Sequence, residues 1–99
     1  MGLYDQATAD LDSALEIEPE DADALTYRGR AHYKAGEYRE AIDDFDAALE
    51  LDPNDTLALF YRGRAYYKLD QYFVAIVDFD EVIARQPDNA RAYFYRGRA

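Results

Sequence analysis

Tyrosine and arginine recur together along this sequence, at a spacing that suits the binding of carboxylate groups. Three times a tyrosine is followed three residues later by an arginine, at Tyr27 and Arg30, at Tyr61 and Arg64, and at Tyr95 and Arg98. Side chains three residues apart share a face when the segment is helical. Arginine donates paired hydrogen bonds to carboxylates, and tyrosine adds contact area with little loss of rotamer entropy. The pattern therefore predicts a basic, aromatic surface for an acidic or extended segment.

Neighbouring residues extend this surface, and a second row of arginines stands close to it in the sequence. The complete set of candidate binding residues is Tyr27, Arg30, Tyr33, Lys34, Tyr61, Arg64, Tyr67, Lys68, Tyr95 and Arg98. A second row of arginines stands directly before the glycines, at Arg28, Arg62 and Arg96. We expect this second row to pair with carboxylates inside the fold. Internal pairing of the first row is the less favoured alternative, and the sequence leaves it open.

Catalysis and metal binding have little support in the sequence. There is no cysteine, and the single histidine, His32, has no repeated partner, so we expect it to be structural. The carboxylates within 43–46 and 78–81 would fan over the solvent face of a helix instead of converging on an ion. Neither a nucleophile motif nor a phosphate-binding loop is present. We therefore expect no enzyme activity, no metal and no cofactor.

The overall composition argues against several classes of partner. The 99 residues carry a net charge of -10, which disfavours nucleic acid, itself a polyanion. Hydrophobic residues make up 49% of the chain, so we expect it to fold instead of staying disordered. No apolar run approaches the roughly 20 residues of a membrane-spanning helix. The first residues lack the charged and apolar regions of a signal peptide, which favours a cytoplasmic protein.

A period of 34 residues underlies these patterns. The segment Tyr-Arg-Gly-Arg-Ala at 27–31 returns at 61–65 and 95–99. Three prolines keep the same spacing: Pro19, Pro53 and Pro87. Such a period is typical of stacked helix–turn–helix units. Apolar spacing predicts helices over about 4–17, 22–35, 38–51, 56–69, 72–85 and 90–99. The expected N-cap residues are Asp21, Asp55 and Asn89.

Two properties of these predicted helices bear on packing and charge. Glycine is unfavourable inside a helix, so glycines that recur in register indicate a neighbouring helix in close contact. The expected close contacts are at Gly29, Gly63 and Gly97. Most of the 11 basic residues fall on the first helix of each predicted pair, whereas the second helices are rich in acidic residues. An acidic molecule would therefore have one basic face.

On these residues the sequence resembles the tetratricopeptide repeat family. Each unit of that family has a glycine in its first helix, an alanine and a bulky apolar residue in its second helix, and a closing proline. The matching alanines are Ala7, Ala41 and Ala75, and the matching bulky residues are Leu11, Phe45 and Phe79. The departures from the pattern are Leu25 and Leu59 for a large aromatic residue, His32 for tyrosine and Val82 for alanine. None of them threatens the fold.

The resemblance implies an all-α, right-handed superhelix of about six antiparallel helices in one domain, 1–99. Its parts would be the second helix of a partial repeat (1–21), complete repeats at 22–55 and 56–89, and the start of another at 90–99. We expect this chain to be a piece of a longer protein. The resemblance also implies that the first helices line a concave groove that binds peptides. The family's clamp for a C-terminal carboxylate uses asparagine, which these first helices lack, so that ligand is not predicted.

The sequence thus predicts a protein-interaction scaffold that binds an acidic or extended protein segment in a basic, tyrosine-rich groove. The alternative is a purely structural stretch of a longer repeat array, in contact with its own protein or with itself. The sequences that flank residues 1 and 99 would distinguish the two hypotheses.

An apolar group interrupts the acidic outer face predicted for the fifth helix. It consists of Phe73, Val74 and Val77, where the preceding unit has the charged residues Arg39, Glu40 and Asp43. Contiguous exposed apolar surface usually marks a contact site. The expected partner is a second copy, a neighbouring domain or a separate protein, with weak self-association through this helix or the last one. The alternative is that the helix tilts and buries the three side chains.

Overall fold

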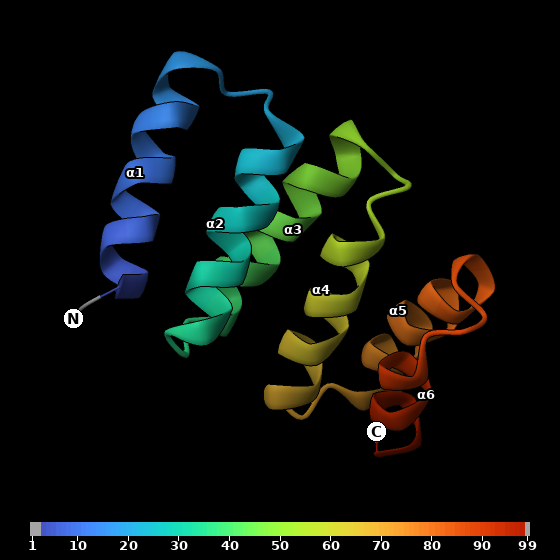
Figure 1. Cartoon of the computed structure of the whole chain (residues 1–99). Coiled ribbons are helices and arrows are strands. Elements are labelled where there is room, and N and C mark those ends of the chain that lie inside the picture. The colour runs from blue at the N-terminus through green and yellow to red at the C-terminus, as the bar shows by residue number, and fades with distance from the viewer. Residues whose placement is uncertain (1–2, 99) are drawn as a thin grey trace.

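Six α-helices make up residues 3–98, the part of the chain that the computed structural model describes (Figure 1). They are α1 (Leu3–Ile17), α2 (Ala22–Lys34), α3 (Tyr38–Leu51), α4 (Thr56–Lys68), α5 (Tyr72–Arg85) and α6 (Ala90–Arg98). No strand occurs among these residues, and the prediction of an all-α helical repeat is confirmed. Helices α2 and α4 end one residue earlier than expected. Residues 1, 2 and 99 lie outside the described part, as does the expected end of the last helix at Ala99.

Polar side chains begin the first helix of each pair. The first N–H groups of a helix have no partner within it, and a side-chain oxygen just before the helix can accept from them. Asp21 and Asp55 each accept a hydrogen bond from the backbone N–H three residues later, at 3.1 and 3.0 Å. Asn89 accepts the same bond at 3.0 Å. The three predicted N-caps are confirmed.

Left-handed backbone connects each first helix to its second. Gly36 has a φ of 83° between α2 and α3, and Asp70 has a φ of 62° between α4 and α5. A residue with a Cβ adopts this conformation at a cost that glycine avoids. Asp70 accepts a hydrogen bond from the Tyr72 hydroxyl at 2.9 Å, which ties this turn to the start of α5. The second turn is therefore the more strained of the two.

The helices pack in chain order, and α2 and α4 also touch one another. In Figure 1 these two helices stand side by side, with α3 behind them, and all three are in mutual contact. Helix α5 in turn contacts α4 and α6. The side chains of Phe45 in α3 and Phe79 in α5 are fully buried in this packing. The first helices thus form one layer whose free face carries the candidate site.

The recurring glycines lie where a second helix leaves no room for a side chain. A Cβ on Gly29 would stand 2.6 Å from the Phe45 ring, and one on Gly63 would stand 2.9 Å from the Phe79 ring. The predicted close contacts are therefore confirmed at these two positions. The prediction is wrong for Gly97, because no described atom beyond its chain neighbours and the nearby backbone of α6 comes within 4 Å of a Cβ built there. That face of α6 has no second helix packed on it within the described chain.

Candidate functional site

The arginine before each glycine is bound to aspartates of the second helices. Arg28 donates two hydrogen bonds to Asp44, at 2.8 and 2.6 Å, and a third to Asp12 at 2.7 Å. Both aspartates lie 16 residues from the arginine along the chain, one before it and one after it. One guanidinium therefore joins α2 to α1 and to α3. Two aspartates of the fold balance its charge and occupy three of its five N–H donors, so it has little left to offer a ligand.

The second unit repeats this arrangement. Arg62 donates two hydrogen bonds to Asp78, at 2.9 and 2.7 Å, and one to Asp46 at 2.9 Å. Arg96 in α6 is bound to Asp80 at 3.0 Å. Internal pairing of this arginine row, the outcome that the sequence favours, is confirmed at all three positions.

Burial and ion pairing act in opposite directions on the Arg62–Asp78 pair. Burial raises the pKa of Asp78 above its usual value, because the carboxylate leaves water, and the hydrogen bonds from Arg62 oppose this rise. The same hydrogen bonds are the largest cause of a raised pKa at Arg62. The charge of Arg62 also lowers the pKa of Asp78 and so favours the ionised form of this buried carboxylate.

The other arginine row meets aromatic rings instead of carboxylates. The guanidinium carbon of Arg64 lies 4.5 Å from the ring centre of Tyr95, 5.1 Å from that of Tyr33, 5.6 Å from that of Tyr61 and 5.8 Å from that of Phe60. Such distances are those of cation–π contacts. Among the side chains described, those of residues 6–98, no carboxylate forms an ion pair with Arg64, and its buried Nε has no hydrogen-bond partner. Arg64 is therefore a cation to which the described side chains supply no counter-charge.

Two further arginines continue this row along the first helices. Arg30 lies 5.4 Å from the Tyr61 ring centre, and Arg98 lies 5.3 Å from that of Phe94. Neither forms an ion pair among the described residues. We call these arginines and the rings beneath them the ladder: Arg30, Tyr33, Phe60, Tyr61, Arg64, Phe94, Tyr95 and Arg98. The ladder runs across α2, α4 and α6.

The tyrosines predicted for this surface take different positions. Tyr33 and Tyr61 are buried and support the arginines from below instead of standing free. Arg30 lies over the ring of Tyr61 in α4, and no cation–π contact joins it to Tyr27, the tyrosine three residues before it. The Tyr67 ring packs against Tyr72 at the start of α5, with 5.6 Å between centres. Tyr27 is exposed, as are Lys34 and Lys68.

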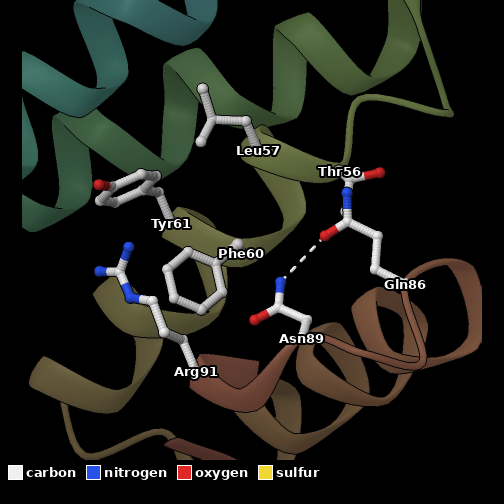
Figure 2. Close-up of a pocket in the computed structure, with 7 residues that line it drawn as sticks. All are labelled: Thr56, Leu57, Phe60, Tyr61, Gln86, Asn89 and Arg91. Atoms are coloured by element: carbon white, nitrogen blue, oxygen red, sulfur yellow. Dashed lines mark hydrogen bonds between the residues drawn. The ribbon is translucent and has the colours of Figure 1, made fainter. Parts of the chain in front are cut away.

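A pocket that the sequence prediction missed lies beside the ladder, between α4 and α6 (Figure 2). Its volume is about 180 Å³, and its lining residues are Thr56, Leu57, Phe60, Tyr61, Gln86, Asn89 and Arg91. Leu57, Phe60 and Arg64 are spaced as i, i+3 and i+7, which is the signal by which this helix face could have been recognised. Phe94 was missed as well, although it stands one 34-residue period after Phe60.

The apolar group on α5 is exposed. The exposed fractions are 88% for Phe73, 60% for Val77 and 42% for Val74. The alternative in which the helix tilts and buries them is therefore wrong. We call these three residues the outer patch; its role as a contact surface is a proposal.

Other candidate sites find little support in the described part of the chain. Among the described side chains of residues 6–98, no three histidine or acidic groups are placed to hold a metal ion. His32 lies 2.8 Å from a carboxylate oxygen of Glu37 and 3.7 Å from one of Asp44, at the edge of the Arg28 ion pair. This position suits the structural role expected for it. None of the described helices combines the length and the apolar character that crossing a membrane requires.

Comparisons with known proteins agree with the observed fold. Residues 22–55 and 56–89 each match the tetratricopeptide repeat family. The second TPR domain of human RPAP3, in complex with HSP70 peptide SGPTIEEVD, is 26% identical, with a TM-score of 0.90 over 96% of this chain and 79% of that one. MamA from Desulfovibrio magneticus RS-1 is 32% identical, with a TM-score of 0.92 over 97% of this chain and 54% of that one.

A plant structure shares the fold at lower identity. The Arabidopsis OM64 TPR domain is 23% identical, with a TM-score of 0.94 over 96% of this chain and 78% of that one. A search of curated protein sequences found no match.

Proposed function

The chain belongs to the tetratricopeptide repeat family, and on that premise we propose that it is a protein-interaction module. Its ligand is an acidic or extended peptide segment that lies along the ladder, across α2, α4 and α6. The ten residues expected from the sequence remain the candidate contact set, with Arg64 at its centre. Tyr33 and Tyr61 contribute from below, by holding the arginines in place.

The observation that carries this proposal is the difference between the two arginine rows. Arg28 and Arg62 are neutralised by aspartates of the fold, whereas Arg64 lies among four aromatic rings without a carboxylate from the described chain. An arginine without a counter-charge, held rigidly by rings, loses little entropy when a carboxylate binds it. Charge-assisted hydrogen bonds are about twice as strong as neutral ones. A ligand carboxylate therefore gains most at Arg64.

The similarity to a peptide-bound relative supports the same class of ligand. The peptide in the human RPAP3 complex, SGPTIEEVD, ends in two glutamates, a valine and an aspartate. The ligand that we propose for this chain shares the acidic character of that peptide. Because asparagine is absent from α2, α4 and α6, the present site would read the acidic side chains of a segment instead of a chain terminus.

The test is a titration of an acidic peptide library against the wild-type chain and against Arg64→Glu. The charge reversal should weaken binding about tenfold or more, since it places like charges in contact. The control is Arg39→Glu, which makes the same charge change at an exposed position on α3. Binding should also weaken as salt rises, because exposed charges are screened beyond about 10 Å at 0.1 M. Equal affinity of wild type and Arg64→Glu, or a preference for basic peptides, would refute the proposal.

The outer patch supports a second, weaker contact. Phe73 is almost fully exposed and lies beside the exposed Val74 and Val77, and contiguous apolar surface of this kind favours association. The occupant is a second copy of the chain or another protein. A net charge of -10 opposes self-association, so a dimer formed here would be weak.

A further inference from the structure

The pocket between α4 and α6 has the size of one side chain. Its volume is about 180 Å³. A buried cavity of about 150 Å³ accommodates a benzene molecule, whereas sites for drug-sized ligands start at about 300 Å³. The pocket is therefore large enough for a leucine- or phenylalanine-sized group and too small for a complete cofactor or metabolite.

The walls of the pocket favour an apolar occupant. Leu57 and Phe60 project from α4 and form one side. On the other side Asn89 donates a hydrogen bond to Gln86 at 2.9 Å (Figure 2). The side-chain carbonyl of Asn89 accepts the N–H of Ala92 at 3.0 Å. These amide groups already have partners within the fold. A polar occupant would find few free groups to bind, whereas an apolar one would cover the exposed side chain of Leu57 and lie against the edge of the buried Phe60 ring.

Two arginines flank this apolar wall. Arg91 lies 5.0 Å from the centre of the Phe60 ring, and Arg64 lies 5.8 Å from the same ring. Within residues 3–98 neither arginine forms an ion pair. Arg91 lines the pocket itself, so a carboxylate next to the buried group would meet a cation there.

We propose that this pocket binds one apolar side chain of the peptide segment, flanked by an acidic residue that Arg91 binds. The inference rests on the proposed function, because it assigns the register and the anchor residue of the same ligand. The apolar side chain, which we call the anchor, is about the size of leucine. The acidic residue next to it lies on the side of the pocket that faces the ladder. Purely acidic segments therefore bind more weakly than acidic segments with one apolar residue.

The first unit has a different surface at the matching place. One period earlier, Leu57 and Phe60 correspond to Asp23 and Thr26, and Asn89 corresponds to Asp55. The Thr26 hydroxyl donates a hydrogen bond to Asp55 at 2.6 Å, so these groups bind each other. At this place Asp23 would repel a ligand carboxylate that stands next to an apolar side chain. The apolar side chain of the peptide therefore binds at the second unit and not at the first. This choice fixes the position of the peptide along the ladder.

The experiment uses two fluorescein-labelled acidic peptides that differ at one central position, leucine in one and alanine in the other. Fluorescence anisotropy measures their dissociation constants for the wild-type chain, Leu57→Asp, Arg91→Gln and Arg64→Gln. Leu51→Asp, at an exposed leucine outside the pocket, is the matched control. Circular dichroism verifies that each variant is folded, and side-chain amide NMR signals of Gln86 and Asn89 report occupancy of the pocket directly.

The wild-type chain should bind the leucine peptide about tenfold more tightly than the alanine peptide, as expected for partial burial of the additional carbons. Leu57→Asp should reduce this preference to less than about twofold, Leu51→Asp should retain it, and Arg91→Gln should weaken both peptides. Only the leucine peptide should shift the Gln86 and Asn89 amide signals.

Equal wild-type affinity for the two peptides, with both weakened by Arg64→Gln, would overturn the pocket inference and leave the proposed function standing. If neither peptide binds the wild-type chain, the proposed function and the pocket inference fail together.

Discussion

Units 22–55 and 56–89 pack their helices in the same way. In each, a glycine of the first helix lies against a phenylalanine of the second, Gly29 against Phe45 and Gly63 against Phe79. In each, the arginine before that glycine donates three hydrogen bonds to aspartates of the two flanking helices. We call this contact between the first and second helix of a unit the glycine seam. Because it needs a precise fit of shape and charge, the same residue types recur in it.

The two units differ where they face outward. On the outer side, exposed charges of α3 are replaced by Phe73, Val74 and Val77 in α5. On the ladder side, Thr26 is replaced by Phe60, whose ring lies beside Arg64 and Arg91. Neither change affects the glycine seam, so the outer surfaces are free to differ. The features suited to binding therefore concentrate in the second unit.

We expect the largest loss of stability from removal of Arg62, the arginine directly before the seam glycine Gly63. Arg62→Ala leaves Asp78, whose side chain is 3% exposed, as a buried carboxylate without its counter-charge. Removing one partner of a buried ion pair costs about 3–5 kcal/mol in other proteins, and we expect a loss near the lower end, because Arg62 is partly exposed. Urea denaturation at neutral pH measures the free energy of unfolding.

Arg96→Ala is the matched control for that variant. Its partner Asp80 has a side chain that is 54% exposed, so water can replace the lost bond. Exposed ion pairs contribute about 0–1 kcal/mol. Similar losses for Arg62→Ala and Arg96→Ala would contradict the conclusion that the seam depends on a buried pair.

A side chain added to the glycine seam should have the next largest effect. Gly63→Val places new atoms where a Cβ alone would stand 2.9 Å from the Phe79 ring, and overpacking of this kind costs about 1–3 kcal/mol. Gly97→Val should change stability by only about 0.5 kcal/mol or less, because nothing in the described chain packs there. Thermal denaturation compares the midpoints. An unchanged midpoint for Gly63→Val would mean that α4 and α5 can move apart at this position with little loss of stability.

The smallest effect on stability is expected from exchanging the outer faces of the two units. The combined variant Phe73→Arg, Val74→Glu and Val77→Asp gives α5 the residues of α3 at exposed positions. Stability should stay within about 1 kcal/mol of wild type, as for surface changes. Sedimentation across protein concentration should show that any association of the wild-type chain is lost. Unfolding of the variant would show that these residues support the core.

Much of the fold could be predicted from the sequence because its causes are local or periodic. The 34-residue period, the N-caps and the apolar spacing act within one helix or one turn, and the structure confirms them. The internal pairing of Arg28 and Arg62 was also predicted, because both stand directly before a glycine at which a second helix was expected to pack. The contact expected at Gly97 failed because it needs a second helix that the described chain does not contain.

The site was predicted less completely, because its contacts join helices about one repeat apart. Spacing within one helix predicted that Arg30 shares a face with Tyr27, and it did not predict that the Arg30 guanidinium lies over Tyr61 of α4. Burial of Tyr33 and Tyr61, and the pocket between Phe60 and Arg91, depend on how α4 is placed against α2 and α6.

The sequence by itself determined the helices, the glycine seam and the presence of two arginine rows. Only the tertiary structure decided which arginines stay without a counter-charge and where the apolar pocket forms. The physical reason is that a helical period specifies the face on which a side chain lies, whereas the partner of that face depends on the packing of the neighbouring helix.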